Sequence, residues 1–266
     1  MKLAISGKGG VGKSTVAGTL ARLYAADGHR VLAVDADPDA NLASALGLPS
    51  SFRSQIHTIS TERKLIEERT GAKVREFGQM FKLNPDVSDI AERYAVRYEG
   101  VDLLVLGAVQ RAAGGCACPE SVLLKSLVSH LVLRRNDVVI LDMEAGIEHL
   151  GRGTASGVDL MMVVVEPGQR SVETAERVRQ MSADLGIRHF GVVLNKTADP
   201  EEDNRWIASK FGENHLLGTI PLDIRIAQAD RQGLALADLG YSELLNPFRK
   251  LQKALQSYRT AKESIS

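Results

Sequence analysis

Nine residues near the amino terminus, Gly7–Thr15, have the types and spacing of a loop that binds nucleotide phosphates. They fit the pattern G-x-x-x-x-G-K-[ST] between Gly7 and Ser14. In such a loop the backbone N–H groups turn inward on a triphosphate, Lys13 can reach the β and γ oxygens, and the Ser14 hydroxyl can hold Mg²⁺. The sequence therefore predicts a nucleotide-binding loop made of Gly9, Gly10, Val11, Gly12, Lys13, Ser14 and Thr15.

This chemistry requires a strand before the loop and a helix after it. Lys2–Ser6 is a short apolar run, and residues 14–26 carry apolar side chains at helical spacing. This context favours a true phosphate-binding loop over a glycine-rich turn that matches the pattern by chance.

Two further segments deliver carboxylates after apolar strands. Asp37 follows the strand-like run 30–34, from where its carboxylate can face the γ-phosphate; a turn aspartate before Pro38 is the alternative. Residues 138–142 have the form of a Walker B strand, which predicts that Asp142 joins Ser14 in the Mg²⁺ shell. Asp35 and Asp39 receive no catalytic role; each is either solvated or bound to loop backbone.

Asn195 and Pro221 are candidates for the base-binding end of the site. Each stands at the end of a predicted strand, 190–194 and 216–220 respectively. Asn195 either reads the base or caps the strand end. Pro221 would line the other side of the ring.

The two cysteines of the chain, Cys116 and Cys118, form a second candidate site. In an extended segment residues two apart point to the same side, so both sulfurs can approach one metal ion. Pro119 suits the first turn of a helix, whose positive end would favour the Cys118 thiolate. A two-fold dimer with this loop on its axis would supply four sulfurs, but spacing does not choose between Ni²⁺ and Zn²⁺. Two ordinary thiols, or a redox pair, are the alternatives.

The apolar runs predict the fold that positions these residues. They are continuous rather than alternating, and most are separated by helical stretches, which predicts an α/β fold with a doubly wound, mostly parallel sheet covered by helices on both faces. The predicted strands are 2–6, 30–34, 101–106, 138–141, 160–165, 190–194 and 216–220.

Composition limits the function classes. Lys+Arg and Asp+Glu both number 33, a formal net charge of +0, so no global field attracts nucleic acid or anionic lipid. Met1 leads directly into the first strand, and no apolar run approaches the roughly 20 residues of a membrane span. We expect one cytoplasmic domain over residues 1–266, with no nucleic-acid partner and no stable membrane association.

Two segments are open to more than one interpretation. A more polar insertion, around 49–100, either shapes partner contacts or forms a peripheral cap; within it, residues 61–70 are expected to be helical with Leu65 and Ile66 inward. The last helical pattern, around 244–258, either lies on a membrane surface or packs its apolar stripe on the sheet, and the second is favoured.

Lys8, directly after the first glycine of the loop, resembles the signature lysine of the deviant P-loop ATPases, which include ParA, MinD and the nitrogenase iron protein. The resemblance implies that Lys8 crosses a dimer interface to the partner's nucleotide, and that Asp37 orients the attacking water. It also implies that the Gly146 N–H senses the γ-phosphate and that Asn195 reads adenine, so that the nucleotide is ATP or ADP.

Taken together, the loop, the residues 35–39, the Cys116–Cys118 pair and the run 145–154 resemble the CooC family of nickel-inserting maturation ATPases. This resemblance implies a homodimer with ATP, a nickel ion held between paired Cys-x-Cys loops, and a client that is carbon monoxide dehydrogenase or a related nickel enzyme. His149 is not assigned as a ligand. Two competing functions are a positioning ATPase like MinD or ParA, and an electron-transfer ATPase like the nitrogenase iron protein, although no cysteine lies between Asp142 and Gly153.

Overall fold

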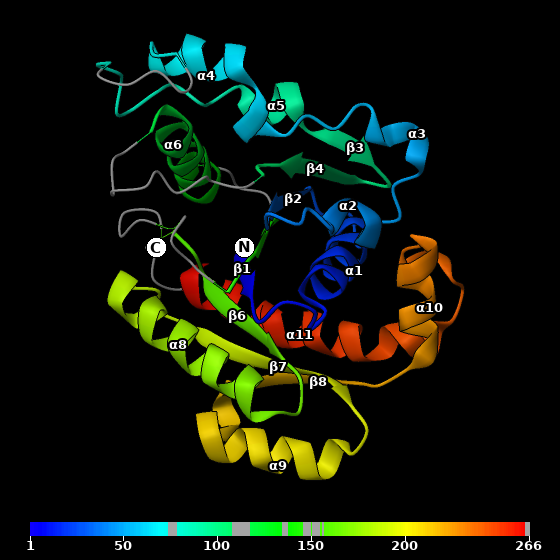
Figure 1. Cartoon of the computed structure of the whole chain (residues 1–266). Coiled ribbons are helices and arrows are strands. Elements are labelled where there is room, and N and C mark those ends of the chain that lie inside the picture. Colours follow the sequence, from blue (N-terminus) through cyan, green and yellow to red (C-terminus); the bar gives the residue numbers. More distant parts are fainter. Residues whose placement is uncertain are drawn as a thin grey trace.

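An eight-stranded sheet organises the chain (Figure 1). The computed structural model describes residues 1–73, 79–107, 118–134, 138–145, 150, 155 and 157–263. The strand order is β3-β4-β2-β5-β1-β6-β7-β8, and every neighbouring pair is parallel except β3 with β4. The strands are β1 Lys2–Ser6, β2 Val31–Ala36, β3 Val96–Tyr98, β4 Val101–Val105, β5 Val138–Met143, β6 Leu160–Val165, β7 Phe190–Thr197 and β8 Leu216–Pro221.

Helices cover both faces of this sheet, which confirms the predicted doubly wound fold (Figure 1). The α-helices of the described residues are α1 Lys13–Ala26, α2 Leu42–Ala45, α3 Ser50–Arg53, α4 Arg63–Thr70, α5 Ile90–Tyr94, α6 Pro119–Arg134, α8 Gln169–Leu185, α9 Pro200–Phe211, α10 Ile224–Gln232 and α11 Ser242–Glu263. Three short 3₁₀ turns are η1 Ile59–Thr61, η2 Glu213–His215 and η3 Leu236–Asp238.

The two faces of the sheet define two apolar layers. Successive side chains of a strand point to opposite faces, so Leu3 and Ile5 of β1 pack in one layer and Ala4 in the other. The first layer joins α1, α10 and α11 to the sheet, and the second joins α4, α6, α8 and α9. Because both faces are buried, the strands are continuous apolar runs, which is the pattern that made them recognisable in the sequence.

The insertion contributes more core than its polar composition suggests. Leu65 and Ile66 of α4 are 2% and 0% exposed, as predicted, and pack with Ile90 of α5 in the layer that contains α6. The Ser60 N–H donates to the Leu106 carbonyl at 2.9 Å, so the segment is tied to the edge of the sheet. The sequence prediction missed β3, a three-residue antiparallel strand too short to give a periodic signal.

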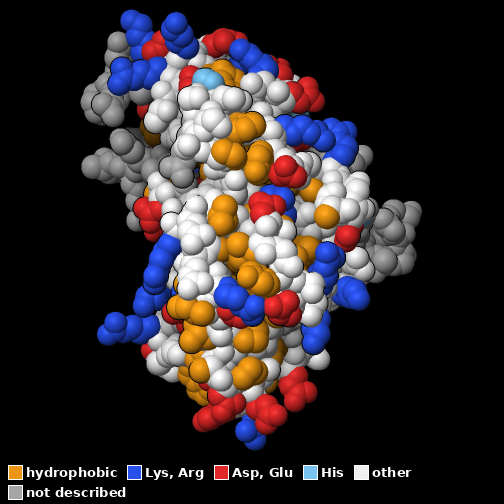
Figure 2. Space-filling model, turned by 90° about the vertical axis from the view of Figure 1, so that its right-hand side faces the viewer, with side chains coloured by type: hydrophobic (Ala, Val, Ile, Leu, Met, Phe, Trp, Pro, Cys, Tyr) orange, Lys and Arg blue, Asp and Glu red, His pale blue; other side chains and the backbone are white. Residues whose placement is uncertain are grey.

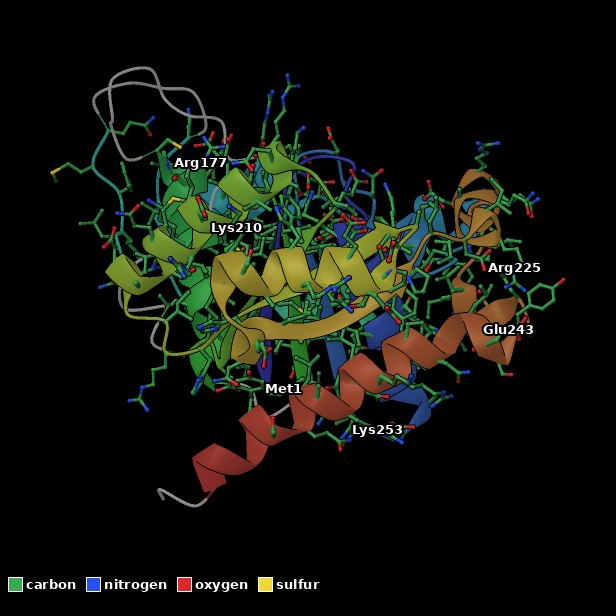
Figure 3. All side chains as sticks on the ribbon, turned by 90° about the horizontal axis from the view of Figure 1, so that it is seen from below. Met1, Arg177, Lys210, Arg225, Glu243 and Lys253 are labelled. Atoms are coloured by element: carbon green, nitrogen blue, oxygen red, sulfur yellow. The ribbon has the colours of Figure 1, made fainter. Side chains whose placement is uncertain are left out.

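Helix α11 buries its apolar stripe, which confirms the favoured interpretation of the carboxyl-terminal pattern. Phe248, Leu251 and Leu255 are at most 1% exposed, and a side-chain carbon placed on Gly218 of β8 would lie 3.5 Å from Leu251 Cβ. At the start of the helix Glu243 accepts from Arg225 of α10 at 2.8 Å, and Figure 3 shows the two side chains together. None of the described helices has the length and apolar character of a membrane span.

Replacement of Leu251 tests whether α11 belongs to the core. Leu251→Ala should lower the free energy of unfolding by about 2–5 kcal/mol, because it leaves a cavity between α11 and β8. Urea unfolding measures the change, with Lys253→Ala on the exposed side of the same helix as the control (Figure 3). Equal stability of the two variants, with weaker vesicle binding by Leu251→Ala, would favour the membrane-surface interpretation instead.

Candidate functional site

The strand order brings the predicted site residues to one edge of the sheet. β1 lies between β5 and β6, and β5 also pairs with β2. Asp142 is in register with Asp35 on one side and with Ile5 on the other. Since β1 runs into Gly7, both carboxylates end next to the phosphate-binding loop. Parallel strands, whose carboxyl ends share an edge, make this convergence possible.

Two glycines explain why the loop can have its shape. Gly7 has φ of 150°, and a Cβ there would lie 2.4 Å from the Val164 carbonyl oxygen of β6. Gly12 has φ of 93° and is the residue before α1; a Cβ there would lie 2.5 Å from Asn195 Nδ2. In the part of the chain that the structure describes, no side-chain hydrogen bond caps the amino end of α1. Its first N–H groups therefore remain available to an anion, and the helix dipole favours one there.

Lys13 forms an ion pair with Asp37 below the surface. Lys13 Nζ lies 3.2 Å from Asp37 Oδ2, and the two side chains are 7% and 11% exposed. The other carboxylate oxygen of Asp37 accepts from the Asp39 N–H at 3.1 Å. The structure thus places two predicted catalytic residues in contact, and a phosphate approaching Lys13 would compete with Asp37 for the ammonium group.

The carboxylate of Asp142 is fully buried. Both its oxygens are buried and neither has a partner of hydrogen-bond geometry within the described ranges. Burial raises the pKa of Asp142 from its ordinary value of 3.8 to about 7, against the lowering effect of the nearby Ser14 hydroxyl. A carboxylate held beside a serine hydroxyl in this way is the donor set that Mg²⁺ prefers, so the residues present fit the predicted ion.

Asp35, which the sequence left unassigned, holds the backbone of the next segment. Its oxygens accept from the N–H groups of Leu42, at 2.9 Å, and Asp37, at 3.3 Å. Burial raises the pKa of Asp35 to about 6, although these two hydrogen bonds lower it. Asp35 is therefore the anchor that fixes the position of Asp37, while Asp39 is exposed.

Asn195 lies against the phosphate-binding loop and is 7% exposed. Its Nδ2 donates to the Val11 carbonyl at 2.7 Å, and its Oδ1 accepts from the Lys196 N–H at 3.0 Å. A side-chain amide has one further N–H and further lone pairs, so these contacts leave capacity for a base. Pro221 ends β8, as predicted, and is exposed. The role of these residues at adenine stays a prediction.

The remaining site residues are only partly described. Lys8 is exposed and its ammonium group makes no ion pair within the described ranges. Ser6 Oγ donates to the Glu144 carbonyl at 2.9 Å, which ties the end of β1 to the segment after β5. Gly146 and His149 lie outside the described residues, so the predicted γ-phosphate contact of Gly146 is untested.

Cys118 is described and Cys116 is not. Cys118 is a free thiol directly before α6, and its Sγ accepts from the Ser121 N–H at 3.4 Å. That bond lowers the thiol pKa as expected from a helix end, but burial outweighs it and raises the pKa overall. The helix end therefore acts on the thiol in the predicted direction, but desolvation outweighs it in the free chain. Within the described ranges no three metal-ligating side chains come together.

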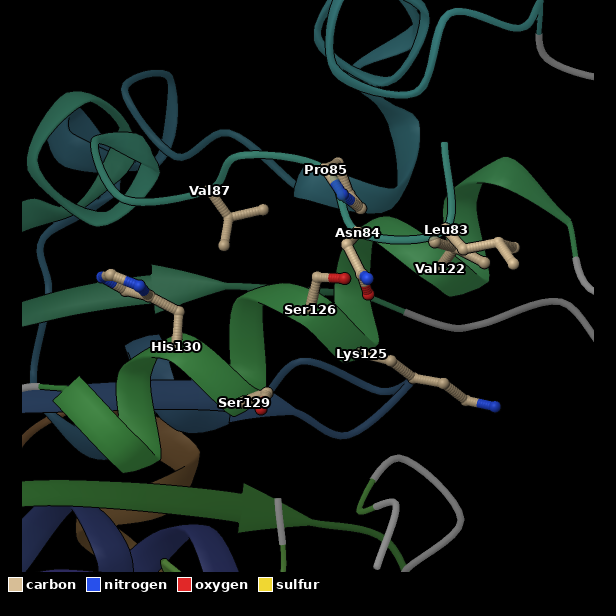
Figure 4. Close-up of a pocket in the computed structure, with 9 residues that line it drawn as sticks. All are labelled: Leu83, Asn84, Pro85, Val87, Val122, Lys125, Ser126, Ser129 and His130. Atoms are coloured by element: carbon tan, nitrogen blue, oxygen red, sulfur yellow. The ribbon is translucent and has the colours of Figure 1, made fainter. Parts of the chain in front are cut away.

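A hollow of about 450 Å³ lies away from the phosphate-binding loop, between residues 83–87 and α6 (Figure 4). It is lined by apolar Leu83 and Val122 and by polar Ser126 and His130. Val122 donates its N–H to the Cys118 carbonyl at 3.0 Å, so one end of the hollow adjoins the cysteine segment.

Two side chains at the site were missed by the sequence reasoning. Lys196 Nζ lies 2.6 Å from the Gly10 carbonyl oxygen and 2.6 Å from Glu166 Oε1. The sequence signal that could have indicated them is their location, because Glu166 and Lys196 each come shortly after an apolar run predicted to be a strand that ends near the loop.

These strand ends, with the loop between them, define a P-loop nucleotide-binding protein. The chain belongs to the CobQ/CobB/MinD/ParA nucleotide binding domain family, which matches residues 2–236.

Within this family, the chain is most usefully compared with individual relatives of high sequence identity. The chain is 48% identical over 239 residues to the carbon monoxide dehydrogenase accessory protein CooC of Rhodospirillum rubrum, with 90% of each sequence covered. It is 43% identical over 236 residues to an uncharacterized ATP-binding protein of Methanocaldococcus jannaschii, with 88% of this chain and 90% of the relative covered. The predicted resemblance to the CooC family is therefore confirmed.

Solved structures agree on the fold. A chain of the MinC:MinD cell division protein complex of Aquifex aeolicus superposes with a TM-score of 0.68 at 20% identity, covering 97% of this chain and 96% of that one. At this identity the likeness supports the fold alone.

The raised pKa of Asp142 predicts how stability depends on pH. The folded protein retains a proton that the unfolded chain releases near pH 4, so nucleotide-free protein should lose stability as the pH rises from about 4 to about 7. Asp142→Asn should remove part of this pH-dependent loss of stability. At pH 8 its free energy of unfolding should therefore exceed that of wild type, by up to ~1.4 kcal/mol per unit of pKa shift.

Thermal or urea unfolding between pH 5 and pH 8 measures this difference. Asp39→Asn neutralises an exposed carboxylate nearby and is the matched control. An identical pH dependence for Asp142→Asn and wild type would show that the buried carboxylate is not responsible.

Proposed function

We propose that this protein is a Mg²⁺-dependent ATPase that acts as a homodimeric metallochaperone, inserting nickel into carbon monoxide dehydrogenase or a related nickel enzyme. The observation that carries the proposal is the 48% identity to CooC over 90% of both sequences. The Cys116–Cys118 pair supplies a chemical reason for a metal cargo. Localisation in the cytoplasm and organisation as one domain are parts of the same proposal.

The contacts at the phosphate-binding loop support the part of the proposal that concerns ATP binding and hydrolysis. Lys13 would exchange Asp37 for the β and γ oxygens, which removes the present ion pair and frees the Asp37 carboxylate to position water. Mg²⁺ bound at this site would supply positive charge that neutralises the charge developing on the phosphates. Ser14 and Asp142 would hold the ion, and the loop N–H groups together with the amino end of α1 would hold the phosphates.

Replacement of Asp37 separates binding from hydrolysis. Asp37→Asn should reduce kcat for ATP hydrolysis at least ~100-fold, because the carboxylate that orients water is lost. ATP affinity should be kept or increased, since Lys13 no longer has a competing anion. Phosphate release and equilibrium binding measure the two effects, with Asp39→Asn as the control. Unchanged hydrolysis in Asp37→Asn would assign water positioning to another group.

The proposed metal site requires two copies of the chain. Each subunit would provide two thiolates, so a four-coordinate site is completed only when paired loops meet on a two-fold axis. Exposed Lys8, extending to the partner's nucleotide, would make that pairing depend on ATP. In this proposal nickel is the cargo of the site, although thiolates also suit Zn²⁺.

Metal and mass measurements on the same samples test this arrangement. With a non-hydrolysable ATP analogue, wild type should elute as a dimer and retain about one Ni²⁺ per two chains. Cys116→Ser and Cys118→Ser should dimerise but lose the metal, and Lys8→Ala should stay monomeric. Metal retention by both cysteine variants would reject the thiolate site. Preferential retention of Zn²⁺ when both metals are offered would reject nickel as cargo.

A further inference from the structure

Lys196 contacts the phosphate-binding loop from outside the predicted motif. It follows Asn195 near the end of β7, and its ammonium group lies 2.6 Å from the Gly10 carbonyl oxygen. Glu166, directly after β6, accepts from the same group at 2.6 Å. Three segments that are distant in sequence are therefore joined by one side chain.

Asn195 and Lys196 together hold two consecutive carbonyls of the loop. Asn195 Nδ2 donates to Val11 O at 2.7 Å, next to the Gly10 carbonyl that Lys196 binds. In a trans peptide the C=O and the following N–H point in opposite directions. Holding these carbonyls against β7 therefore turns the N–H groups of Val11 and Gly12 away from β7, into the loop itself.

The peptide between Gly10 and Val11 is held at both of its ends. The Val11 N–H also makes a hydrogen bond to the Lys8 carbonyl, but at 3.4 Å, near the upper limit for such a bond. The bond from the Lys196 ammonium to the Gly10 carbonyl is short and charge-assisted, and it favours the same orientation of the peptide as the Val11 bond does.

The backbone of Lys196 is shaped for this task. Its φ is +59°, a left-handed conformation that residues with a Cβ rarely adopt. The Lys196 N–H donates to Asn195 Oδ1 at 3.0 Å, which stabilises the turn. Glu166 is itself held, because its N–H donates to Ser171 Oγ of α8 at 3.1 Å. The backbones of Lys196 and Glu166 are thus held without a ligand, while their paired side chains are 41% and 39% exposed.

We propose that Asn195, Lys196 and Glu166 form a strap that orients the phosphate-binding loop, and that Lys196 is a positioning residue for the polyphosphate of the nucleotide rather than for its base. The inference rests on the proposed nucleotide-binding function and does not depend on the metal cargo. It predicts that loss of Lys196 weakens every polyphosphate ligand alike, including one without a base.

The experiment compares ATP, GTP and inorganic tripolyphosphate as competitors of a fluorescent ATP analogue. Lys196→Met keeps the aliphatic stem and should weaken ATP and tripolyphosphate equally, by about ten-fold, the loss expected for one charge-assisted hydrogen bond. Lys196→Arg should restore most of the affinity. Glu166→Gln should give a smaller loss of the same kind. In hydrolysis assays KM should rise more than kcat falls.

Lys210→Met, which changes an exposed lysine on α9, is the control and should bind like wild type (Figure 3). Melting temperatures identify any variant whose weaker binding reflects unfolding; if Lys196→Met fails to fold, Glu166→Gln carries the comparison. Unchanged tripolyphosphate affinity in both variants would overturn the proposal, and so would a loss confined to ATP, which would place Lys196 at the base. Failure of wild type to bind ATP would instead reject the proposed function.

Discussion

The ion pair between Lys13 and Asp37 is the interaction on which the nucleotide site depends. Lys13 stands beside three carboxylates, those of Asp35, Asp37 and Asp142, and all four residues are less than 9% exposed. One ammonium group cannot neutralise three buried carboxylates when all are ionised, and burial raises the pKa values of Asp35 and Asp142. The nucleotide-free site is therefore electrostatically incomplete, and a divalent cation would complete it.

The surrounding fold keeps these charges close. Asp35 and Asp142 are neighbours because β2 and β5 are parallel and in register, and the loop is their neighbour because β1 pairs with β5 on the other side. Apolar layers on both faces prevent the strands from moving apart to admit water. The free energy that holds unfavourable charges together thus comes from burial of strands and helices outside the site.

Sequence reasoning predicted the elements whose signal is local. The strands around Leu3, Ile140 and Val163 were recognisable because burial on both faces makes them uninterrupted apolar runs. Strand β3 was missed because three residues carry no period, and the core contribution of Ile59 and Ile90 was hidden in a polar segment. Asp37 and Asp142 were found because a motif fixes their distance from a strand. Lys196 and Glu166 were not, since their meeting depends on the pairing of β6 with β7.

Helix α6 offers a route between the two candidate sites. Cys118 directly precedes it, and the chain enters β5 four residues after its end, so the cysteine segment and Asp142 lie at the two ends of one helix–strand unit. The buried apolar side chains of α6 between Leu123 and Val132 are packed in the same layer as Leu141 and Met143. A close-packed layer transmits displacement rather than absorbing it. Binding of a cation beside Asp142 that shifts β5 would therefore also shift α6, the helix that begins beside Cys118. This gives a physical path by which nucleotide binding could affect metal binding at the cysteines, as the proposed function requires.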